Sequence, residues 1–257
     1  MKILYINESN QWEGATVALY RIILAMKERG HEVHVVTSNS IGPFIEKLDA
    51  IGVKHYNHQI SLTVYPHTQN PVRWIKRVLH LLYRIHQEKI FISNVIDKVK
   101  PDFVHTNVGP LSQAYDICME KQIPHVWHQR EYQDLDFGLH FFPSWRVFNR
   151  KIKSNTSYSI SITKGIFKYR NLRLNKDIVI YDGVFSRKQI LGVKKGVRKE
   201  NYILFVGRIQ EAKCPFDLLI AFSQFHKLYP TVRLLFAGNY SEESGYYQKC
   251  KHYIEEM

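Results

Sequence analysis

The chain alternates short apolar runs with longer amphipathic stretches, and this rhythm predicts its secondary structure. Residues Lys2–Ile6 form a short β-rich run, and a helical pattern of apolar positions follows from Thr16 to Arg29. Gly30 comes directly after that pattern, as the left-handed residue that ends a helix often does. Two further runs, "HEVHVVTS" and "VKHYNHQ", flank a helical segment in "IGPFIEKLDAIG". Repetition of strand, helix and strand favours a parallel sheet with right-handed crossovers, so we predict a doubly wound α/β domain.

The same rhythm continues along the rest of the chain. A long helix is predicted over 72–99, and later strands are predicted in "PDFVHTN", "IPHVWHQ", "SYSISIT" and "KDIVIYDGV". Residues 186–200 are basic and contain glycine, which is typical of a linker. They separate a domain over 1–185 from a region over 201–257, where "NYILFVG" and "VRLLFAG" predict two strands around one helix. Because that region is roughly half of a usual domain, we expect it to be incomplete.

The composition indicates which kinds of partner and which cellular compartment to expect. The 36 Lys and Arg residues against 23 Asp and Glu give a net charge of +13, which favours an anionic partner such as nucleic acid, acidic lipid or a phosphorylated metabolite. No recognisable nucleic-acid-binding module accompanies the charge, so we expect no nucleic-acid partner. Three widely spaced cysteines indicate neither a disulfide framework nor a metal site. With no signal peptide and no long apolar window, we expect a cytoplasmic protein.

Two loops carry candidate chemistry. Arg208 follows the predicted strand "YILFVG", and Lys213 lies in the same connection, where ligands of open α/β sheets bind. An Arg and a Lys there could hold a diphosphate, although a solvated basic loop is the alternative. Gly14 lies just ahead of the first predicted helix, where backbone amides could approach an anion or a sugar hydroxyl; the alternative is a plain turn glycine. His105, at the end of "PDFVH", is expected to be structural.

The segment "ILFVGRIQEAKCPFDLLIAFSQFHKLYPTVRLLFAG" resembles the opening of the C-terminal domain of GT-B glycosyltransferases of family 4. "VIYDGV" is similar to the hinge motif of that family, with Asp182 where Asn is usual. "MKILYI", "GHEVHVVTS", "PDFVHTN" and "IPHVWHQREY" follow in the order expected for the N-terminal half. The resemblance implies a GT-B fold, with a complete N-terminal Rossmann-like domain and an incomplete second one.

The resemblance also implies roles for individual residues. Arg208 and Lys213 match the pair that neutralises the diphosphate of a nucleotide-sugar donor, and Gly14 matches the glycine loop that faces the donor phosphates and the acceptor. No metal and no cofactor are implied beyond the nucleotide diphosphate sugar itself. The family's two donor-binding glutamates, which are seven residues apart, have no match, because Glu255 and Glu256 are adjacent.

The predicted strand over 126–128 matches one where many relatives have an active-cleft histidine. A simple alignment places either His128 or Arg130 there, and a structural role for His128 stays open beside a catalytic one. "WHQRE" is similar to a branch with "WHIRE" and a downstream Asp, which makes Arg130, Glu131 and Asp134 or Asp136 the counterparts in the acceptor cleft.

The implied function is transfer of a sugar, with retention, from a nucleotide diphosphate sugar to a glycan or lipid-linked acceptor. Because half of the donor domain has no match, we expect this chain alone to be inactive. The alternatives are one half of a split glycosyltransferase that a second chain completes, and a non-catalytic binding or membrane-associated remnant.

A basic amphipathic segment over 73–89 bears on these alternatives. One helical face would carry Arg73, Arg77, His80 and Arg84, and the neighbouring face Trp74, Val78, Leu81 and Ile85. Such a helix could make a peripheral contact with anionic lipid at the inner face of a membrane. The alternative is a surface helix that packs its apolar face on the sheet.

Overall fold

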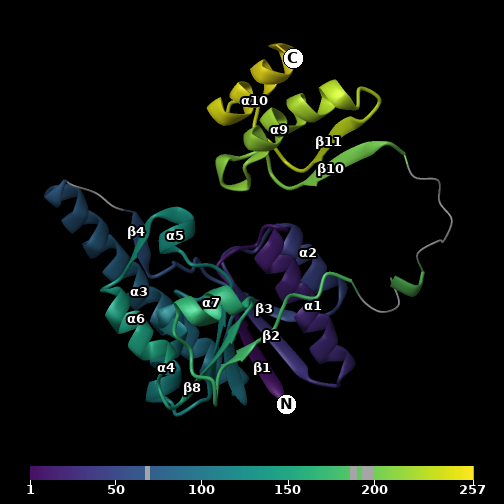
Figure 1. Cartoon of the computed structure of the whole chain (residues 1–257). Coiled ribbons are helices and arrows are strands. Elements are labelled where there is room, and N and C mark those ends of the chain that lie inside the picture. The colour runs from purple at the N-terminus through teal and green to yellow at the C-terminus, as the bar shows by residue number, and fades with distance from the viewer. Residues whose placement is uncertain (67–69, 186–189, 193–199, 257) are drawn as a thin grey trace. The chain divides into compact units, whose positions relative to one another are not determined.

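The computed structural model describes residues 1–66, 70–185, 190–192 and 200–256, and the chain forms two compact units, Met1–Ser186 and Arg187–Met257 (Figure 1). Most of the predicted linker over 186–200 lies outside the described residues. The two units are described separately below as unit 1 and unit 2.

Unit 1 is built on a seven-stranded parallel sheet with the order β3-β2-β1-β5-β6-β8-β9. Its strands are β1 Lys2–Ile6, β2 Glu32–Thr37, β3 Lys54–Asn57, β5 Phe103–Thr106, β6 His125–Gln129, β8 Ser157–Ser161 and β9 Ile178–Val179. The predicted doubly wound α/β domain is confirmed. The strand order reverses direction between β1 and β5, and in such sheets a crevice opens at the carboxyl ends of those two strands.

Helices cover both faces of this sheet (Figure 1). They are α1 Gly14–Glu28, α2 Pro43–Ala50, α3 Pro71–Val99, α4 Ser112–Glu120, α5 Asp134–Phe137, α6 Trp145–Ile152 and α7 Lys164–Tyr169. The helix predicted to end before Gly30 does so, and Gly30 has a φ of 79°, in the left-handed region. Within the described part of the chain, no helix has a stretch both long and apolar enough to cross a bilayer.

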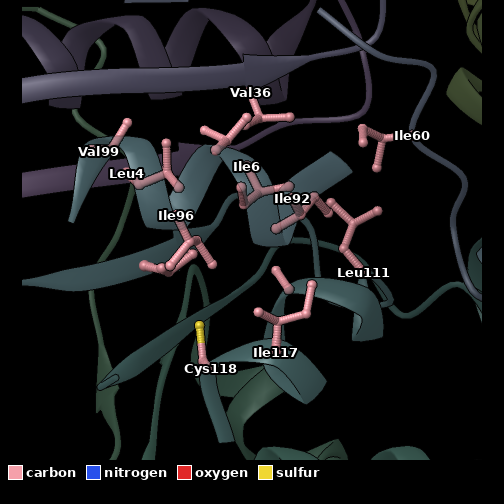
Figure 2. Close-up of a cluster of buried hydrophobic side chains, with 13 residues drawn as sticks. Leu4, Ile6, Val36, Ile60, Ile92, Ile96, Val99, Leu111, Ile117 and Cys118 are labelled. Atoms are coloured by element: carbon pink, nitrogen blue, oxygen red, sulfur yellow. The ribbon is translucent and has the colours of Figure 1, made fainter. Parts of the chain in front are cut away.

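Two buried clusters fix the layers, and β1 contributes to both. Leu4 and Ile6 point to a cluster with α3 and α4, which includes Ile92, Ile96 and Ile117 (Figure 2). Their neighbours Ile3 and Tyr5 point to the opposite face, where Leu19, Ile23, Phe44 and Leu48 come from α1 and α2. Alternate residues of β1 therefore face opposite layers, as a central strand of a parallel sheet requires.

A third cluster lies around Trp127 of β6, which is fully buried and packs against Tyr115, Phe148 and Ile152. Above it, β4 Val64–Pro66 pairs antiparallel with β7 Leu139–Phe141. This small two-stranded pairing is not predicted by the hydrophobic pattern, because three-residue strands give too little periodicity to recognise.

Unit 2 contains a parallel pair, β10 Tyr202–Val206 and β11 Arg233–Ala237, with the short 3-10 helix η1 Glu211–Lys213, helix α9 Pro215–Leu228 and helix α10 Gly245–Glu256. The predicted strand, helix and strand are all present. Apolar side chains of the strands stay exposed: Leu204 is 49% and Val206 is 74% accessible. Parallel strands are normally buried on both faces, so this sheet leaves apolar surface that other structure would cover.

Candidate functional site

The crevice of unit 1 begins with two asparagines that directly follow neighbouring strands. Asn7 comes after β1 and Asn107 after β5, and both are buried. Asn107 Nδ2 donates to Asn7 Oδ1 at 2.9 Å and to the carbonyl of Ala15 at 3.1 Å. These bonds join the carboxyl ends of the two strands to the start of α1, at the point where the sheet order reverses.

Arg130 extends this polar network from the end of β6. Its Nε donates to the carbonyl and to Oδ1 of Asn107 at 3.1 and 3.0 Å. Its Nη1 donates to both carboxylate oxygens of Asp182, at 2.8 and 2.7 Å. The Arg130 side chain is only 2% accessible, whereas that of Asp182 is 32% accessible. The guanidinium is therefore a buried cation whose charge is balanced by a carboxylate that reaches solvent.

His128 lies beside Arg130, and its hydrogen bonds define its tautomer. Nδ1 lies 3.2 Å from His105 Nε2 and 3.5 Å from Arg130 Nη2. Because a guanidinium can only donate, His128 Nδ1 must accept, and its proton is then on Nε2. That buried Nε2 has no hydrogen-bond partner among the described residues. His128 thus has a buried N–H donor that no described residue satisfies.

Burial and the Arg130 charge lower the pKa of His128 far below its ordinary value. Burial followed by the same charge lowers the pKa of His105 to about 3. Both imidazoles are consequently neutral at physiological pH, and His128 can donate a hydrogen bond without carrying a charge. A role as a hydrogen-bond donor suits this geometry better than a role as a proton-accepting base.

Three glutamates surround the same end of the sheet. Burial, together with the nearby charges of Glu131 and Glu13, raises the pKa of Glu8 to about 7, although a backbone hydrogen bond and the charge of Arg130 act to lower it. Glu8 Oε2 is buried without a hydrogen-bond partner in the described part of the chain. Glu131 accepts from Gln133 Nε2 at 2.8 Å. An acidic and partly protonated environment of this kind suits sugar hydroxyls better than an anion.

Asp134 and Asp136 both accept hydrogen bonds from neighbouring residues of unit 1. Asp134 Oδ2 accepts from the hydroxyl of Tyr169 at 2.6 Å, and Asp136 Oδ2 accepts from the backbone N–H of Tyr132 at 2.8 Å. The buried guanidinium of Arg170 donates to the carbonyls of Glu131 and Tyr132. These contacts fix the loop that carries Arg130 and Glu131.

The guanidinium of Arg170 sits among aromatic rings. Its Cζ lies 4.6 Å from the ring centre of Trp145, 4.9 Å from Phe141 and 5.3 Å from Tyr169. A guanidinium is the most weakly hydrated of the protein cations and stacks well on rings, so it tolerates this burial. Arg170 is therefore a structural brace for the loop after β6.

Gly14 is the first residue of α1 and is exposed. No side-chain cap satisfies the N-terminal amides of this helix, and no atom lies within 4 Å of where a Cβ of Gly14 would stand. The helix start is thus open to a ligand. That Gly14 faces the donor phosphates stays a prediction, and the nearby Glu8 and Glu13 favour a hydroxyl there.

The predicted phosphate pair lies in unit 2, in the connection from β10 to α9. Arg208 is the second residue after β10, Lys213 ends η1, and both are exposed. Gly207 and Gly238, which follow the two strands, approach each other so closely that a Cβ on Gly238 would stand 2.0 Å from the Gly207 carbonyl oxygen. This contact holds the start of the loop flat against β11 and leaves its two cations accessible. Among the described residues, no group of three or more potential metal ligands occurs.

Comparison with known proteins places this arrangement in a family. The model of the family described as Glycosyltransferase Family 4 matches residues 12–158, which is more than half of the chain. The chain belongs to Glycosyltransferase Family 4. The matched residues lie in unit 1 and include Asn107, His128 and Arg130, and the resemblance seen in the sequence is confirmed. No curated protein matches the chain.

Solved structures show the fold that this family 4 chain shares. A glycosyltransferase from Rickettsia africae ESF-5 has a TM-score of 0.64 at 15% identity, with 99% of this chain and 65% of that chain covered. MurG from Acinetobacter baumannii has a TM-score of 0.55 at 12% identity, with 99% and 64% covered. The UDP-GlcNAc 2-epimerase from Neisseria meningitidis, bound to UDP-GlcNAc, has a TM-score of 0.56 at 12% identity, with 99% and 70% covered.

These identities establish the GT-B fold alone, and the predicted fold class is confirmed. The chain spans less than two thirds of the length of the first two of these structures. The sequence pattern had indicated His128, Arg130 and Glu131, which the structure brings together in one crevice of unit 1. It had not indicated Asn7, Asn107 or Glu8, although Asn7 stands directly after one predicted strand and Asn107 is the last residue of another, where both could have been recognised.

Proposed function

We propose that this family 4 chain takes part in retaining glycosyl transfer from a nucleotide diphosphate sugar to a glycan or lipid-linked acceptor. The observation that carries the proposal is the polar network of unit 1 beside the switch point of the sheet, where the buried His128 Nε2 and Glu8 Oε2 have no hydrogen-bond partner among the described residues. An acceptor sugar is rich in hydroxyls that both donate and accept, and this crevice supplies both kinds of partner. His128 would donate to a sugar oxygen, and Glu8 or Glu131 would accept from a hydroxyl.

The donor would bind through Arg208 and Lys213 of unit 2. When the bond to the sugar breaks, negative charge collects on the leaving diphosphate, and preorganised cations stabilise that charge most where water is excluded. The exposed guanidinium of Arg208 can form a two-pronged contact with phosphate oxygens, and Lys213 adds a compact charge. The N-terminus of α9, which follows this loop directly, would add the positive end of its helix dipole.

The proposal also covers the cellular compartment of the reaction and the further structure that the donor site needs. The thiols of Cys118, Cys214 and Cys250 are all unpaired, which fits transfer in the reducing cytoplasm. Donor contacts to the base and the sugar would come from structure that covers the exposed apolar face of β10 and β11, in the same polypeptide or in a second chain. We therefore expect this chain alone to bind a nucleotide diphosphate weakly and to transfer no sugar.

Phosphorus NMR with UDP as the probe tests the donor part directly. UDP resonances should shift on addition of the chain, and Arg208→Ala with Lys213→Ala should weaken the fitted affinity by about tenfold or more, because two charge-assisted contacts are lost. Lys227→Ala, at an exposed position of α9 outside this loop, is the matched control and should leave binding unchanged. Equal binding by the double variant would contradict the assigned role of the pair.

Transfer is tested separately with radiolabelled UDP-sugars and a panel of glycan acceptors. Sugar transfer by the 257-residue chain alone would contradict the expectation that further structure is needed. Activity that appears only when a second chain is added would support it, and loss of that activity in His128→Phe would support the role of the crevice.

A further inference from the structure

Helix α3 is only partly built into unit 1. It has 29 residues, yet its buried side chains, Glu88, Ile92, Val95, Ile96 and Val99, all belong to the last twelve positions. Figure 1 shows its first turns projecting at the margin of the unit. From Pro71 to Arg77 every side chain is exposed. The N-terminal half of the helix thus has a surface that unit 1 does not use.

Three of the four residues of the apolar face predicted from the sequence turn toward the core, whereas Trp74 is 41% exposed. Val78, Leu81 and Ile85 are half-buried and lie on the side of Glu88 and Ile92. The expectation that a surface helix packs this face on the unit agrees with these positions.

A second apolar face lies on the opposite side of α3, and we call it the outward stripe. At 100° per residue its members fall within a sector of about 100°, turned away from the core-facing side chains. They are exposed to between 45% and 65%: Val72, Ile75, Leu79, Leu82, Tyr83 and Ile90. Single exposed apolar residues need no explanation, but six in one sector over five turns of helix, interrupted by His86, indicate a surface that something covers.

Basic residues flank the outward stripe on one side. The sector between the stripe and the core carries Arg73, Lys76, Arg77, His80 and Arg84. No acidic residue occurs in the sequence between Asp49 and Glu88. Arg84 lies 3.7 Å from the buried Glu88, whereas the basic residues of the first turns are exposed.

We propose that the outward stripe of α3 docks on the surface of a membrane that contains anionic lipids. In this arrangement the helix lies along the surface, with the stripe at the boundary between headgroups and acyl chains and the basic flank against the anionic headgroups. A second copy of the chain would be a poor occupant, because it would bring the same basic flank against the first, and like charges repel. This inference does not depend on the proposed sugar transfer.

The C-terminal half of α3 is held in unit 1 by hydrogen bonds of Glu88, so docking of the N-terminal half would orient the unit. The carboxylate of Glu88 accepts from the hydroxyl of Ser61 and from Nε2 of Gln113, each at 2.6 Å. These bonds join α3 to the segment before β4 and to α4. A membrane contact through the first turns would therefore hold the whole of unit 1 in a defined orientation.

Vesicle co-sedimentation of the full chain tests the proposal. The chain should sediment with vesicles of phosphatidylcholine mixed with phosphatidylglycerol, should stay in solution with phosphatidylcholine alone, and should be released by salt. The variant Ile75→Gln with Leu79→Gln removes part of the stripe, and Arg73→Glu with Arg77→Glu reverses part of the flank. Each should lower the partition coefficient by about tenfold or more, since two contributions to surface binding are lost.

Matched controls distinguish docking through α3 from non-specific effects of exposed apolar side chains and of net charge. Ile41→Gln with Leu174→Gln changes two apolar side chains that are 81% and 92% exposed outside α3. Arg29→Glu with Lys54→Glu makes the same change in net charge at exposed positions outside α3. Both controls should bind as the unaltered chain does, and circular dichroism should show equal helix content throughout.

Two results would overturn the proposal. One is binding to anionic vesicles that is absent, or that falls equally in the α3 variants and in the controls. The other is a dimer in sedimentation velocity that dissociates in the Ile75→Gln, Leu79→Gln variant, since the stripe would then be covered by a second copy.

Discussion

The buried Arg130 forms an ion pair with the partly exposed Asp182 that joins the end of β6 to the segment after β9, with Nη1 at 2.8 and 2.7 Å from the two carboxylate oxygens. Both residues stand where the sequence departs from the common pattern of its family: Asp182 replaces the usual hinge Asn, and Arg130 is a candidate for the place of the active-cleft histidine. The structure gives one reason for both departures. A buried guanidinium needs a counter-charge, which an Asn side chain cannot supply.

The pair should show its importance in the stability of unit 1. Asp182→Ala leaves Arg130 buried without a counter-charge, so we expect the free energy of unfolding to fall by about 3 kcal/mol. Asp182→Asn keeps an acceptor and should cost less, about 1 to 2 kcal/mol. All four tryptophans precede residue 146, so urea unfolding followed by tryptophan fluorescence reports on unit 1.

The control for this measurement is an exposed ion pair of the same unit. Asp97 Oδ1 lies 2.6 Å from Lys121 Nζ, and the Asp97 side chain is 61% accessible. Asp97→Ala should cost no more than about 1 kcal/mol, as exposed pairs usually do. Equal losses in Asp97→Ala and Asp182→Ala would show that burial of Arg130 does not make its partner essential.

Three buried histidines should make unit 1 sensitive to mild acid. Burial lowers the pKa of His105 and of His125 to about 3, and that of His128 further. The unfolded chain binds protons on these residues below its own pKa near 6.5, whereas the folded chain does not. Above pH 6.5 both states are neutral at these residues, so the lowered pKa values do not change the free energy of unfolding. Below pH 6.5 only the unfolded chain takes up protons, and the free energy of unfolding falls as the pH drops toward the folded pKa.

A single replacement should change that pH dependence by a measurable amount. His125→Gln removes one of the three protons taken up on unfolding, so the slope of unfolding free energy against pH between 5 and 6 should decrease by about 1.4 kcal/mol per pH unit. Urea titrations at several pH values give the slope. His86→Gln, at an exposed position of α3, serves as the control and should retain the original slope.

Glu8 should act in the opposite direction. Its folded pKa of about 7 lies above the ordinary value of 4.5, mainly because of burial, so the folded chain keeps a proton that the unfolded chain releases between these values. Raising the pH through this window removes stability, and above pH 7 the folded chain must bury a carboxylate. Glu8→Gln should therefore stabilise unit 1 by roughly 2 to 3 kcal/mol at pH 8 and by less than about 1 kcal/mol at pH 5.

The comparison for Glu8 is an exposed acid on a neighbouring element. Glu46→Gln on α2 should change stability by similar small amounts at both pH values. A gain from Glu8→Gln that does not depend on pH would mean that the carboxyl of Glu8 is not protonated in the folded chain near neutrality.

Most of the fold could be predicted from the sequence because its signals are local. Runs such as Lys2–Ile6 and the helical spacing up to Gly30 specify an element from a few adjacent residues. The alternation of strand and helix then restricts the topology, since crossovers between parallel strands are right-handed. The β4–β7 pairing lies beyond such signals, because each strand has three residues and the partners are more than 70 positions apart.

The candidate site could be predicted only in part, because its contacts are long-range. The letters around His128 and Arg130 indicated a cleft, but the contact of His128 with His105, 23 positions away, could not be seen in them. Asp182 was noted as a departure, and only the structure shows that it neutralises Arg130. The second apolar face of α3 was overlooked for a related reason: periodicity identifies apolar faces, but which of two faces meets the core is decided by packing.

The contact between Gly207 and Gly238 gives a last prediction, for unit 2. A Cβ on Gly238 would stand 2.0 Å from the Gly207 carbonyl oxygen and 3.2 Å from the backbone nitrogen of Arg208, so Gly238→Ala must push the two chain segments apart. Because backbone rather than a flexible side chain is in the way, we expect a loss of about 3 kcal/mol or more in the local stability of β10 and β11. Hydrogen exchange of their amides measures this directly, since unit 2 has no tryptophan.

Gly245→Ala, at the open start of α10, offers the matched control because nothing lies within 4 Å of its Cβ position. The displaced loop should also weaken UDP binding, and unchanged protection of β10 and β11 in Gly238→Ala would show that the strands can separate at little cost.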